Sequence, residues 1–228
     1  MRGSRVPRVL RENDLTVVMF GLFAICLVGQ GIAGFRVYND HQIATARATV
    51  DGLGYLRTGH FIEAVFENWE SEFLQMGSLV LLTVFLVQKH SPVSRNVDEP
   101  NEIDAGSRDH DDVPGPVRRG GLMLWVYAHS LSIALFGLFF LTLVLHAVGG
   151  SRDETAERLH VGQPAVSVWS YLVSARFWFE SLQNWQSEFL SVGVLVVLSI
   201  FLRERGSPES LLIDPPHREA AIPSSGSQ

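Results

Sequence analysis

The stretch LTVVMFGLFAICLVGQGIAG, residues 15–34, decides the fold class of this chain. Its only strongly polar residue is Gln30, and a helix of this length reaches about 30 Å, which is the thickness of the hydrocarbon core of a bilayer. Three more apolar runs follow near 73–87, 122–148 and 189–202. The chain has 228 residues, 46 % of them hydrophobic and 18 % charged, with a mean hydropathy of +0.17. These features predict an all-α membrane protein with four transmembrane helices and exclude disorder throughout.

Basic residues are distributed unequally between the loops of this four-span arrangement. Twelve of the 18 Lys and Arg residues fall in the N-terminal segment, the linker between the second and third spans, and the C-terminal tail, whereas six fall in the other two loops. Cytoplasmic loops carry the excess of basic residues in membrane proteins. We therefore expect both termini and the central linker to lie in the cytoplasm, and the two remaining loops to lie outside.

The two halves of the chain repeat each other at an offset of 116 residues. Leu15 aligns with Leu131 and Pro92 with Pro208, without a gap between them. The polar and aromatic motif NWESEFL at 68–74 recurs as NWQSEFL at 184–190, and such a motif would seldom recur by chance at a fixed offset. We infer two tandem two-span repeats, related by a pseudo-two-fold axis along the membrane normal.

The expected domain boundaries follow from these repeats and from composition. They are a basic cytoplasmic N-terminus at 1–14, repeat 1 at 15–92, a disordered acidic cytoplasmic linker at 93–121, repeat 2 at 122–208, and a disordered cytoplasmic tail at 209–228. The linker is rich in Asp, Glu, Pro, Gly and Ser and nearly lacks large apolar residues, which is typical of disorder. Its run Asp109–Asp112 is better explained as a solvated acidic segment than as a cation site.

The chain resembles a known family through motifs spread over most of its length. These are REND at 11–14, FENWESEFLQM at 66–76, RRGG at 118–121, FWFESLQNWQSEFL at 177–190 and FLRERGSPES at 201–210. This pattern is similar to a family of bacterial integral membrane proteins classed as a domain of unknown function. The resemblance implies a multi-pass protein of the bacterial inner membrane and implies no activity, substrate or cofactor.

The outer loops and the segments after them are expected to be helical. Short helices at the membrane surface fit the aromatic segments around Tyr55 and Tyr171. Residues 61–76 and 177–192 contain neither Gly nor Pro. They therefore predict long amphipathic extracytoplasmic segments that continue into the second and fourth spans.

One constellation of polar residues is a candidate site. The apolar parts of the second and fourth spans are too short for a full crossing, which places Glu72 and Glu188 slightly inside the outer boundary. Other polar residues are expected near these two glutamates, and Trp69 and Trp185 are expected to anchor the helices at the interface. The candidate polar site comprises Asn68, Glu72, Asn184, Glu188, Gln30 and His146.

Two interpretations of this constellation remain open. It is either an outward-facing site for a proton, a cation or a small solute, or a set of interfacial residues that stabilise packing between the repeats. The first interpretation corresponds to a small transporter or channel, and the second to a structural, scaffolding or stress-related protein. We favour the second, because Thr83 and Ser199 are the only polar groups in the middle of the second and fourth spans.

Other chemistry is sparse in this sequence. The single cysteine, Cys26, excludes an intramolecular disulfide and a paired-cysteine metal site. No phosphate-binding loop, dinucleotide fingerprint or zinc-protease motif is present, and no basic patch remains once topology is accounted for. We therefore expect no enzymatic activity, no cofactor or metal and no nucleic acid. The lipid bilayer is the expected partner, a homo-oligomer is possible, and any small-molecule ligand is unidentified.

Overall fold

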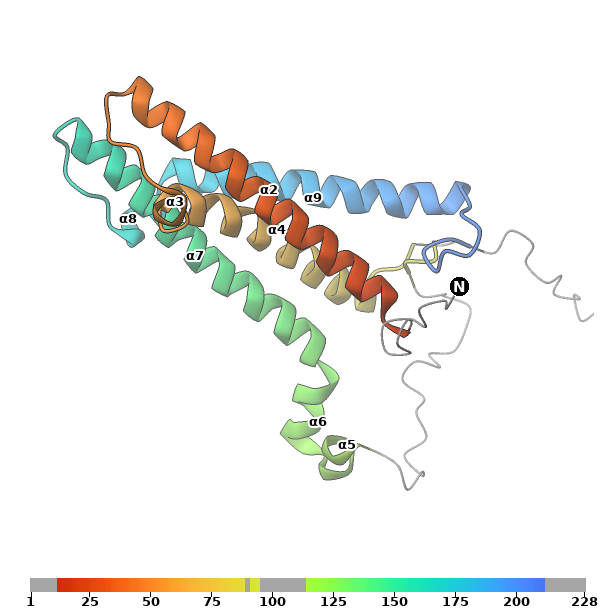
Figure 1. Ribbon diagram of the computed structural model, residues 1–228. Coiled ribbons are helices and arrows are strands. Elements are labelled where there is room, and N and C mark those ends of the chain that lie inside the picture. The colour runs from red at the N-terminus through yellow and green to blue at the C-terminus, as the bar shows by residue number, and fades with distance from the viewer. Residues whose placement is uncertain (1–11, 89–90, 95–113, 212–228) are drawn as a thin grey trace, which may run out of the picture. The chain divides into compact units, whose positions relative to one another are not determined.

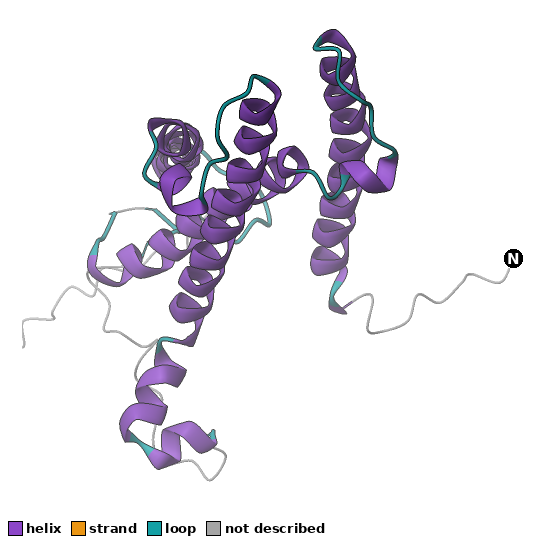
Figure 2. Cartoon of the chain, turned by 90° about the vertical axis from the view of Figure 1, so that its left-hand side faces the viewer, coloured by secondary structure: helices purple, strands orange, loops and turns teal. Residues whose placement is uncertain are grey.

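The computed structural model describes residues 12–88, 91–94 and 114–211. Helices joined by loops make up all the regular structure in these ranges (Figure 2). The predictions for the N-terminal segment, the acidic run Asp109–Asp112 and most of the C-terminal tail lie outside the described residues. At the end of the linker range, Gly115–Arg119 forms the short helix α5 where disorder was predicted. Pro116 in its first turn favours this helix, because the fixed φ of proline suits a helix start.

Three helices of the described chain are long and apolar enough to cross a membrane. They are α2 Asp14–Ala44, α7 Ser130–His160 and α9 Ala175–Phe201 (Figure 1). No residue in the apolar window of α2 is buried within the protein, and few in that of α9 are. Exposed apolar surface of this extent is stable in hydrocarbon and unfavourable in water. The prediction of an all-helical chain is confirmed, with three helices that could span a membrane.

The second predicted span lies in α4, Gly59–Phe85, which has 27 residues like α9. Its first half carries charged residues, so its apolar part is confined to 73–85. Both α4 and α9 run without interruption through the two segments that lack Gly and Pro. The prediction of long helices there is confirmed, whereas the number of spans stays a prediction.

The third apolar run is divided between two helices. The helix α6 covers Gly121–Ala128, and α7 begins only at Ser130. The Ser130 hydroxyl donates to the carbonyl oxygen of Tyr127 at 2.8 Å, and His129 Nδ1 lies 2.8 Å from the carbonyl oxygen of Trp125. Short polar side chains that bind nearby carbonyls compete with helix hydrogen bonds. They account for a break that hydropathy did not predict.

The helix bounds recur along the chain at the offset of 116 residues. The helix α7 begins and ends 116 residues after α2, and α9 begins and ends 116 residues after α4. The short helices α3, Gly52–Tyr55, and α8, Val168–Leu172, also begin 116 residues apart. They stand at the two aromatic segments where short helices were predicted.

Equivalent hydrogen bonds hold the loops before these short helices. The backbone N–H of Val50 donates to Asn39 Oδ1 at 2.9 Å, and the backbone N–H of Val166 donates to Thr155 Oγ1 at 3.0 Å. In both short helices the side chain of the N-cap residue accepts a backbone N–H, as polar N-caps do. The two loops are therefore stabilised in the same way although their sequences differ.

The described chain divides into two compact units. The first contains residues 12–70 and 139–182, and the second contains residues 71–88, 91–94, 114–138 and 183–211. The first unit thus holds α2, α3, α8, the beginnings of α4 and α9, and the end of α7.

Glycines set the close packing of the first unit. A methyl group on Gly59 would lie 2.6 Å from the carbonyl oxygen of Gly149, and a methyl group on Gly149 would collide with the backbone of Glu63. A methyl group on Gly150 would collide with the Tyr171 side chain. The backbones of α4 and α7 therefore touch at a crossing that only glycine permits.

The second unit is held by an aromatic contact and by serine hydrogen bonds. A methyl group on Gly77 in α4 would lie 3.4 Å from the ring of Phe136 in α7. The Ser91 and Ser199 hydroxyls lie 3.0 Å apart and are buried. The Ser94 hydroxyl accepts the backbone N–H of residue 88 at 2.8 Å, just after the end of α4. These contacts tie the end of α4 to α7 and α9 within this unit.

The glycine crossing gives a test of the fold with a control in the same helix. We expect Gly149→Ala to destabilise the protein by about 2 kcal/mol, because the Glu63 backbone cannot move aside as a flexible side chain could. A methyl group on Gly137 would meet no atom of another segment within 4 Å. Gly137→Ala should leave stability unchanged or raise it by up to about 1 kcal/mol. Thermal unfolding in detergent measures both, and equal stability of the two variants would contradict the crossing.

Candidate functional site

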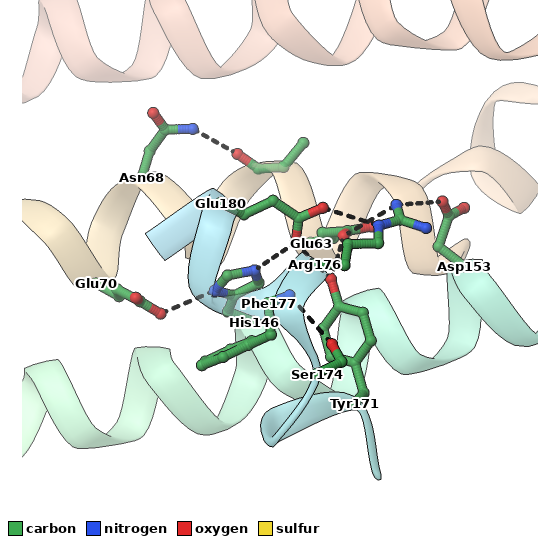
Figure 3. Close-up of polar contacts among 11 residues, drawn as sticks. Glu63, Asn68, Glu70, His146, Asp153, Tyr171, Ser174, Arg176, Phe177 and Glu180 are labelled. Carbon is green, nitrogen blue, oxygen red and sulfur yellow. Dashed lines mark hydrogen bonds and ion pairs between the residues drawn. The ribbon is translucent and has the colours of Figure 1, made fainter. Parts of the chain in front are cut away.

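A cluster of ionisable side chains lies in the first unit, with its centre buried and its Arg176 side partly exposed (Figure 3). The helices α4, α7, α8 and α9 all contribute to it. Its members are Glu63, Glu70, His146, Asp153, Tyr171, Arg176 and Glu180.

Helical spacing places these residues on facing sides of their helices. Glu63 and Glu70 are seven residues apart on α4, and His146 lies seven residues before Asp153 on α7. Residues seven apart project from the same face, two turns from each other. The faces that carry them meet because the glycine crossing brings the backbones of α4 and α7 together. Helix geometry and the glycines therefore assemble the cluster.

His146 is fully buried and lies between two glutamates. Its Nδ1 lies 2.9 Å from Oε2 of Glu70, which is also fully buried. Its Nε2 lies 3.6 Å from Oε2 of Glu180 and makes no hydrogen bond. The ring packs against Phe177, with the ring centroids 4.8 Å apart. The Glu70 carboxylate thus fixes the orientation of the imidazole, and Nε2 points toward Glu180.

The Tyr171 hydroxyl lies between two carboxylates. It is 2.8 Å from Oε1 of Glu63 and 2.5 Å from Oε2 of Glu180. A phenol carries one proton, so it can donate to only one of them at a time. The second short contact is best satisfied when one carboxyl group is itself protonated. Burial and the Glu180 carboxylate raise the pKa of Tyr171 well above its usual range, so the phenol stays protonated.

One arginine serves several carboxylates of the cluster. Arg176 Nε donates to Oε1 of Glu180 at 2.9 Å, and one terminal nitrogen lies 3.5 Å from Oε1 of Glu63 and 3.7 Å from Oδ2 of Asp153. Its other terminal nitrogen lies 3.5 Å from Oε2 of Glu157. Only the bond to Glu180 is short, so Arg176 neutralises chiefly that carboxylate.

The cluster therefore holds more acidic than basic groups in a poorly hydrated place. Four carboxyl groups stand against one guanidinium and one imidazole, and the side chains of Glu63 and Glu70 are 8 % and 0 % exposed. Burying carboxylates without neutralisation is costly. This excess of negative charge must be reduced by bound protons or by a cation.

The protonation of Glu63 reflects its burial near other carboxyl groups. It lies ten residues before the apolar part of α4, and burial raises its pKa to about 7. The hydrogen bond from Tyr171 and the charge of Arg176 lower the pKa, while the carboxylates of Glu180 and Asp153 raise it. Near neutral pH this carboxyl group is therefore divided between its protonated and ionised forms.

A polar cavity of about 310 Å³ in the first unit adjoins the cluster. Asp153 and Arg176 are members of the cluster and also line the cavity. The remaining lining residues are Val37, Tyr38, His41, Gln42, Arg47, His60, Ala156 and Glu157. The cavity is open to solvent, so the Arg176 side of the cluster has a hydrophilic approach.

Three of the clustered residues are placed as metal ligands would be. Glu63, His146 and Glu180 each offer a ligand atom, and these atoms lie within 4.8 Å of one another. The sequence patterns predicted no metal site and did not indicate this arrangement. The seven-residue spacing of the two glutamates on α4 was the signal that could have revealed it.

The cluster has no charged counterpart 116 residues away. Gln30 occupies the position equivalent to His146, and Ala64 the position equivalent to Glu180. Gln30 Nε2 donates to the carbonyl oxygen of Ala64 at 3.2 Å, so a neutral bond joins α2 and α4 there. The positions equivalent to Glu63 and Glu70 are occupied by Phe179 and Gln186. The charge excess is therefore particular to one of the two equivalent places.

The structure distributes the predicted polar site over both units. Gln30, Asn68 and His146 lie in the first unit, whereas Glu72, Asn184 and Glu188 lie in the second. His146 is the member that reaches the buried cluster, and its partners are Glu70 and Glu180 where the prediction named Glu72 and Glu188. It was predicted because its position matches Gln30, although its actual partners were not identified.

The other predicted residues have more exposed surroundings. Asn68 is exposed and donates to the carbonyl oxygen of Ala64 at 2.8 Å, the same atom that accepts from Gln30. Glu72 is exposed and Glu188 is partly buried, and the two are close enough to repel each other electrostatically. Asn184 is also partly buried. A shared site at Glu72 and Glu188 stays a prediction.

The two predicted interface tryptophans are both partly buried. Trp69 packs against Phe23 of α2 and Phe66 of α4, with ring centroids 5.6 Å and 5.3 Å apart. Its ring therefore joins α2 to α4 within the first unit, and its role as a membrane anchor stays a prediction.

The raised pKa of Glu63 predicts a pH dependence of stability. A carboxyl group that binds its proton more tightly in the folded chain stabilises the fold at low pH, and this contribution is lost as pH rises from about 4.5 through about 7. The loss amounts to about 3 kcal/mol. Glu63→Gln should remove this part of the pH dependence, because Gln stays neutral and keeps the hydrogen bond from Tyr171.

Unfolding free energies in detergent between pH 4.5 and 8.5 measure this effect. Glu204→Gln is the matched control, because Glu204 is exposed after the end of α9 and should change nothing. If the free energy of unfolding of the wild type and that of Glu63→Gln change with pH in parallel through neutral pH, the assignment is contradicted.

Comparison with known proteins identifies the family. No curated protein and no solved structure matches the chain. The model of one family, described as a domain of unknown function (DUF6766), matches residues 6–222. This match confirms the resemblance that the sequence motifs indicated. Because it covers nearly the whole chain, the chain belongs to the DUF6766 family.

Proposed function

We propose that this protein is a multi-pass membrane protein that binds a cation in the buried cluster of its first unit. The observation that carries this proposal is the charge excess, four carboxyl groups against one arginine and one histidine. A cation that reaches the cluster relieves repulsion that Arg176 alone does not balance. The adjoining polar cavity supplies a hydrophilic approach for a hydrated ion.

The buried carboxylates favour a cation site over a purely structural role. A structural role is supported by the bonds of Arg176 and Tyr171, which join α8, α9 and α4. However, the neutral bond between Gln30 and Ala64 joins helices at the equivalent place without any charge. Holding helices together therefore does not require buried carboxylates, and their presence is better explained by a ligand.

The membrane arrangement that we propose has four spans and two tandem repeats. The recurrence of helix bounds at 116 residues supports the repeats, and the apolar end of α4 supplies the fourth span. The basic asymmetry places both termini in the cytoplasm of a bacterial cell, with the protein in the inner membrane. The loops that contain α3 and α8, and with them the polar cavity, then lie on the extracytoplasmic side.

Cysteine labelling tests this topology. Cys26→Ser removes the native thiol, and single cysteines are then introduced at Ser94, Thr45 and Ser167. In intact spheroplasts, an impermeant maleimide should label the cysteines introduced at Thr45 and Ser167. It should label the cysteine introduced at Ser94 only after permeabilisation. If only the cysteine at Ser94 is labelled in intact spheroplasts, the orientation is opposite to the one proposed.

A cation screen tests the function. The purified protein is unfolded thermally with Na⁺, K⁺, Mg²⁺, Ca²⁺, Mn²⁺ or Zn²⁺ at equal ionic strength. At a concentration 100 times its Kd, a bound cation stabilises the fold by about 2.7 kcal/mol. We expect stabilisation by at least one cation in the wild type and its loss in Glu180→Gln, with Glu204→Gln again unaffected. If no cation stabilises the wild type, or if Glu180→Gln responds as the wild type does, the cluster is structural.

A further inference from the structure

We infer that Glu63, His146 and Glu180 bind one divalent ion of a first-row transition metal, with Glu70 as the residue that positions His146. This inference rests on the proposed cation binding and specifies the class of the cation. Glu63 comes from α4, His146 from α7 and Glu180 from α9, so three helices supply one ligand each (Figure 3).

The free nitrogen of His146 is the first observation behind this assignment. His146 is 0 % exposed, and its Nε2 has no hydrogen-bond partner although it points at a carboxylate. A buried polar atom without a partner is costly and needs an explanation. A metal ion between Nε2 and the carboxylates would satisfy it.

The distances suit an ion of this size. Transition metals bind imidazole nitrogen and carboxylate oxygen at about 2.0–2.2 Å, which separates adjacent ligands of a tetrahedral site by about 3.4 Å. His146 Nε2 and Glu180 Oε2 lie 3.6 Å apart, too far for a hydrogen bond and close to that separation. The ligand atoms of all three residues lie within 4.8 Å of one another, so Glu63 needs to approach by at most about 1.4 Å, which side-chain torsions can provide.

The second observation is the hydrogen bond on the other side of the imidazole. Oε2 of Glu70 lies 2.9 Å from Nδ1 and is fully buried. Histidines that bind metals almost always donate their second N–H to a carboxylate or carbonyl, which fixes the tautomer and raises the basicity of the ligand nitrogen. With an ion bound at Nε2, Glu70 would hold the imidazole proton on Nδ1 and leave the Nε2 lone pair for the ion.

Arg176 leaves the proposed ligand oxygen of Glu180 available, whereas Tyr171 contacts it. Arg176 binds Oε1 of Glu180, whereas the oxygen that faces His146 is Oε2. The ion pair with Arg176 therefore orients Glu180 through Oε1 and does not occupy Oε2, the proposed ligand oxygen. The Tyr171 hydroxyl lies 2.5 Å from this Oε2, so metal binding requires it to release Glu180 and to donate to Oε1 of Glu63 alone. Arg176 and Tyr171 thus orient the carboxylates in the manner of outer partners at a metal site.

The donor set determines the class of metal. Mg²⁺ and Ca²⁺ prefer sites made entirely of oxygen, whereas one imidazole with two carboxylates suits Mn²⁺, Fe²⁺, Co²⁺ and Zn²⁺. Two carboxylates also balance the double positive charge. Cu⁺ and other soft ions prefer thiolate or thioether ligands, and no such group belongs to the cluster among the described residues.

The experiment measures metal binding to the full-length protein in detergent. The protein is stripped with a chelator and dialysed against Co²⁺, Mn²⁺ or Zn²⁺, with Mg²⁺ and Ca²⁺ in parallel, and bound metal per chain is determined by elemental analysis. Co²⁺ additionally reports its coordination through its visible absorption bands. We expect one transition-metal ion per chain, and a visible spectrum typical of low coordination number.

Paired variants separate this site from adventitious binding. His146→Asn should abolish stoichiometric binding, while His160→Asn, at the exposed end of the same helix, should leave it unchanged. Glu70→Gln retains all three ligands and should weaken affinity 10–100-fold, with a changed Co²⁺ spectrum. Size-exclusion elution and helical content show whether each variant folds, and Glu70→Gln provides the test should His146→Asn fail to fold.

The outcomes distinguish this inference from the proposed function. Stoichiometric binding that survives in folded His146→Asn, or that is unchanged in Glu70→Gln, overturns the metal site. If Na⁺, K⁺, Mg²⁺ or Ca²⁺ stabilises the wild type through Glu180 while Mn²⁺, Co²⁺ and Zn²⁺ do not bind, the protein binds a cation and the transition-metal assignment is wrong. If no cation binds, both proposals fail.

Discussion

The contact between the backbones of α4 and α7 sets the geometry of the buried cluster. Gly59 and Gly149 permit it, because a methyl group on either would meet main-chain atoms of the other helix. The backbone that Gly149 touches is that of Glu63, so one of the clustered carboxylates begins at the crossing itself. Two turns further along α4, Glu70 reaches the imidazole of His146. A wider separation of these helices would leave this hydrogen bond unmade.

The cluster carries charge at one of two places that correspond at the offset of 116 residues. The helix bounds and the hydrogen bonds of the loops recur at this offset, so the two places share the same local elements. The difference lies in a few side chains directed inward. His146 faces Glu180 at one place, and Gln30 binds the Ala64 carbonyl at the other. Six of the seven cluster positions differ from their equivalents, so a charged cluster stands at one place and a neutral helix contact at the other.

Sequence patterns predicted the elements of this fold better than the partners within it. Apolar length and the absence of Gly and Pro predicted the long helices, and the motif at 68–74 led to the offset that the helix bounds follow. The break at His129 was not predicted, because it depends on side-chain bonds to carbonyls that hydropathy does not register.

The candidate site was predicted only in part, and the reason is physical. Glu72 and Glu188 were predicted from their depth in the proposed membrane, because depth follows from counting residues along one helix. The partners of His146 come from α4 and α9, and the choice between Glu70 and Glu72 depends on which face of α4 meets α7. Helix rotation of this kind is set by tertiary packing at glycines, which periodicity within α4 alone does not determine.

The neutral contact between Gln30 and Ala64 bears most directly on why the charges are present. If the only requirement at these positions were to join helices, the neutral pattern would meet it at lower cost, because no carboxylate would need to be desolvated. Glu63, Glu70 and Glu180 instead surround an imidazole that has one nitrogen held and the other free. A packing role accounts for the held nitrogen, since that bond joins α4 to α7. It leaves the other nitrogen without a hydrogen bond, 3.6 Å from a carboxylate, and the proposed cation would supply the missing contact.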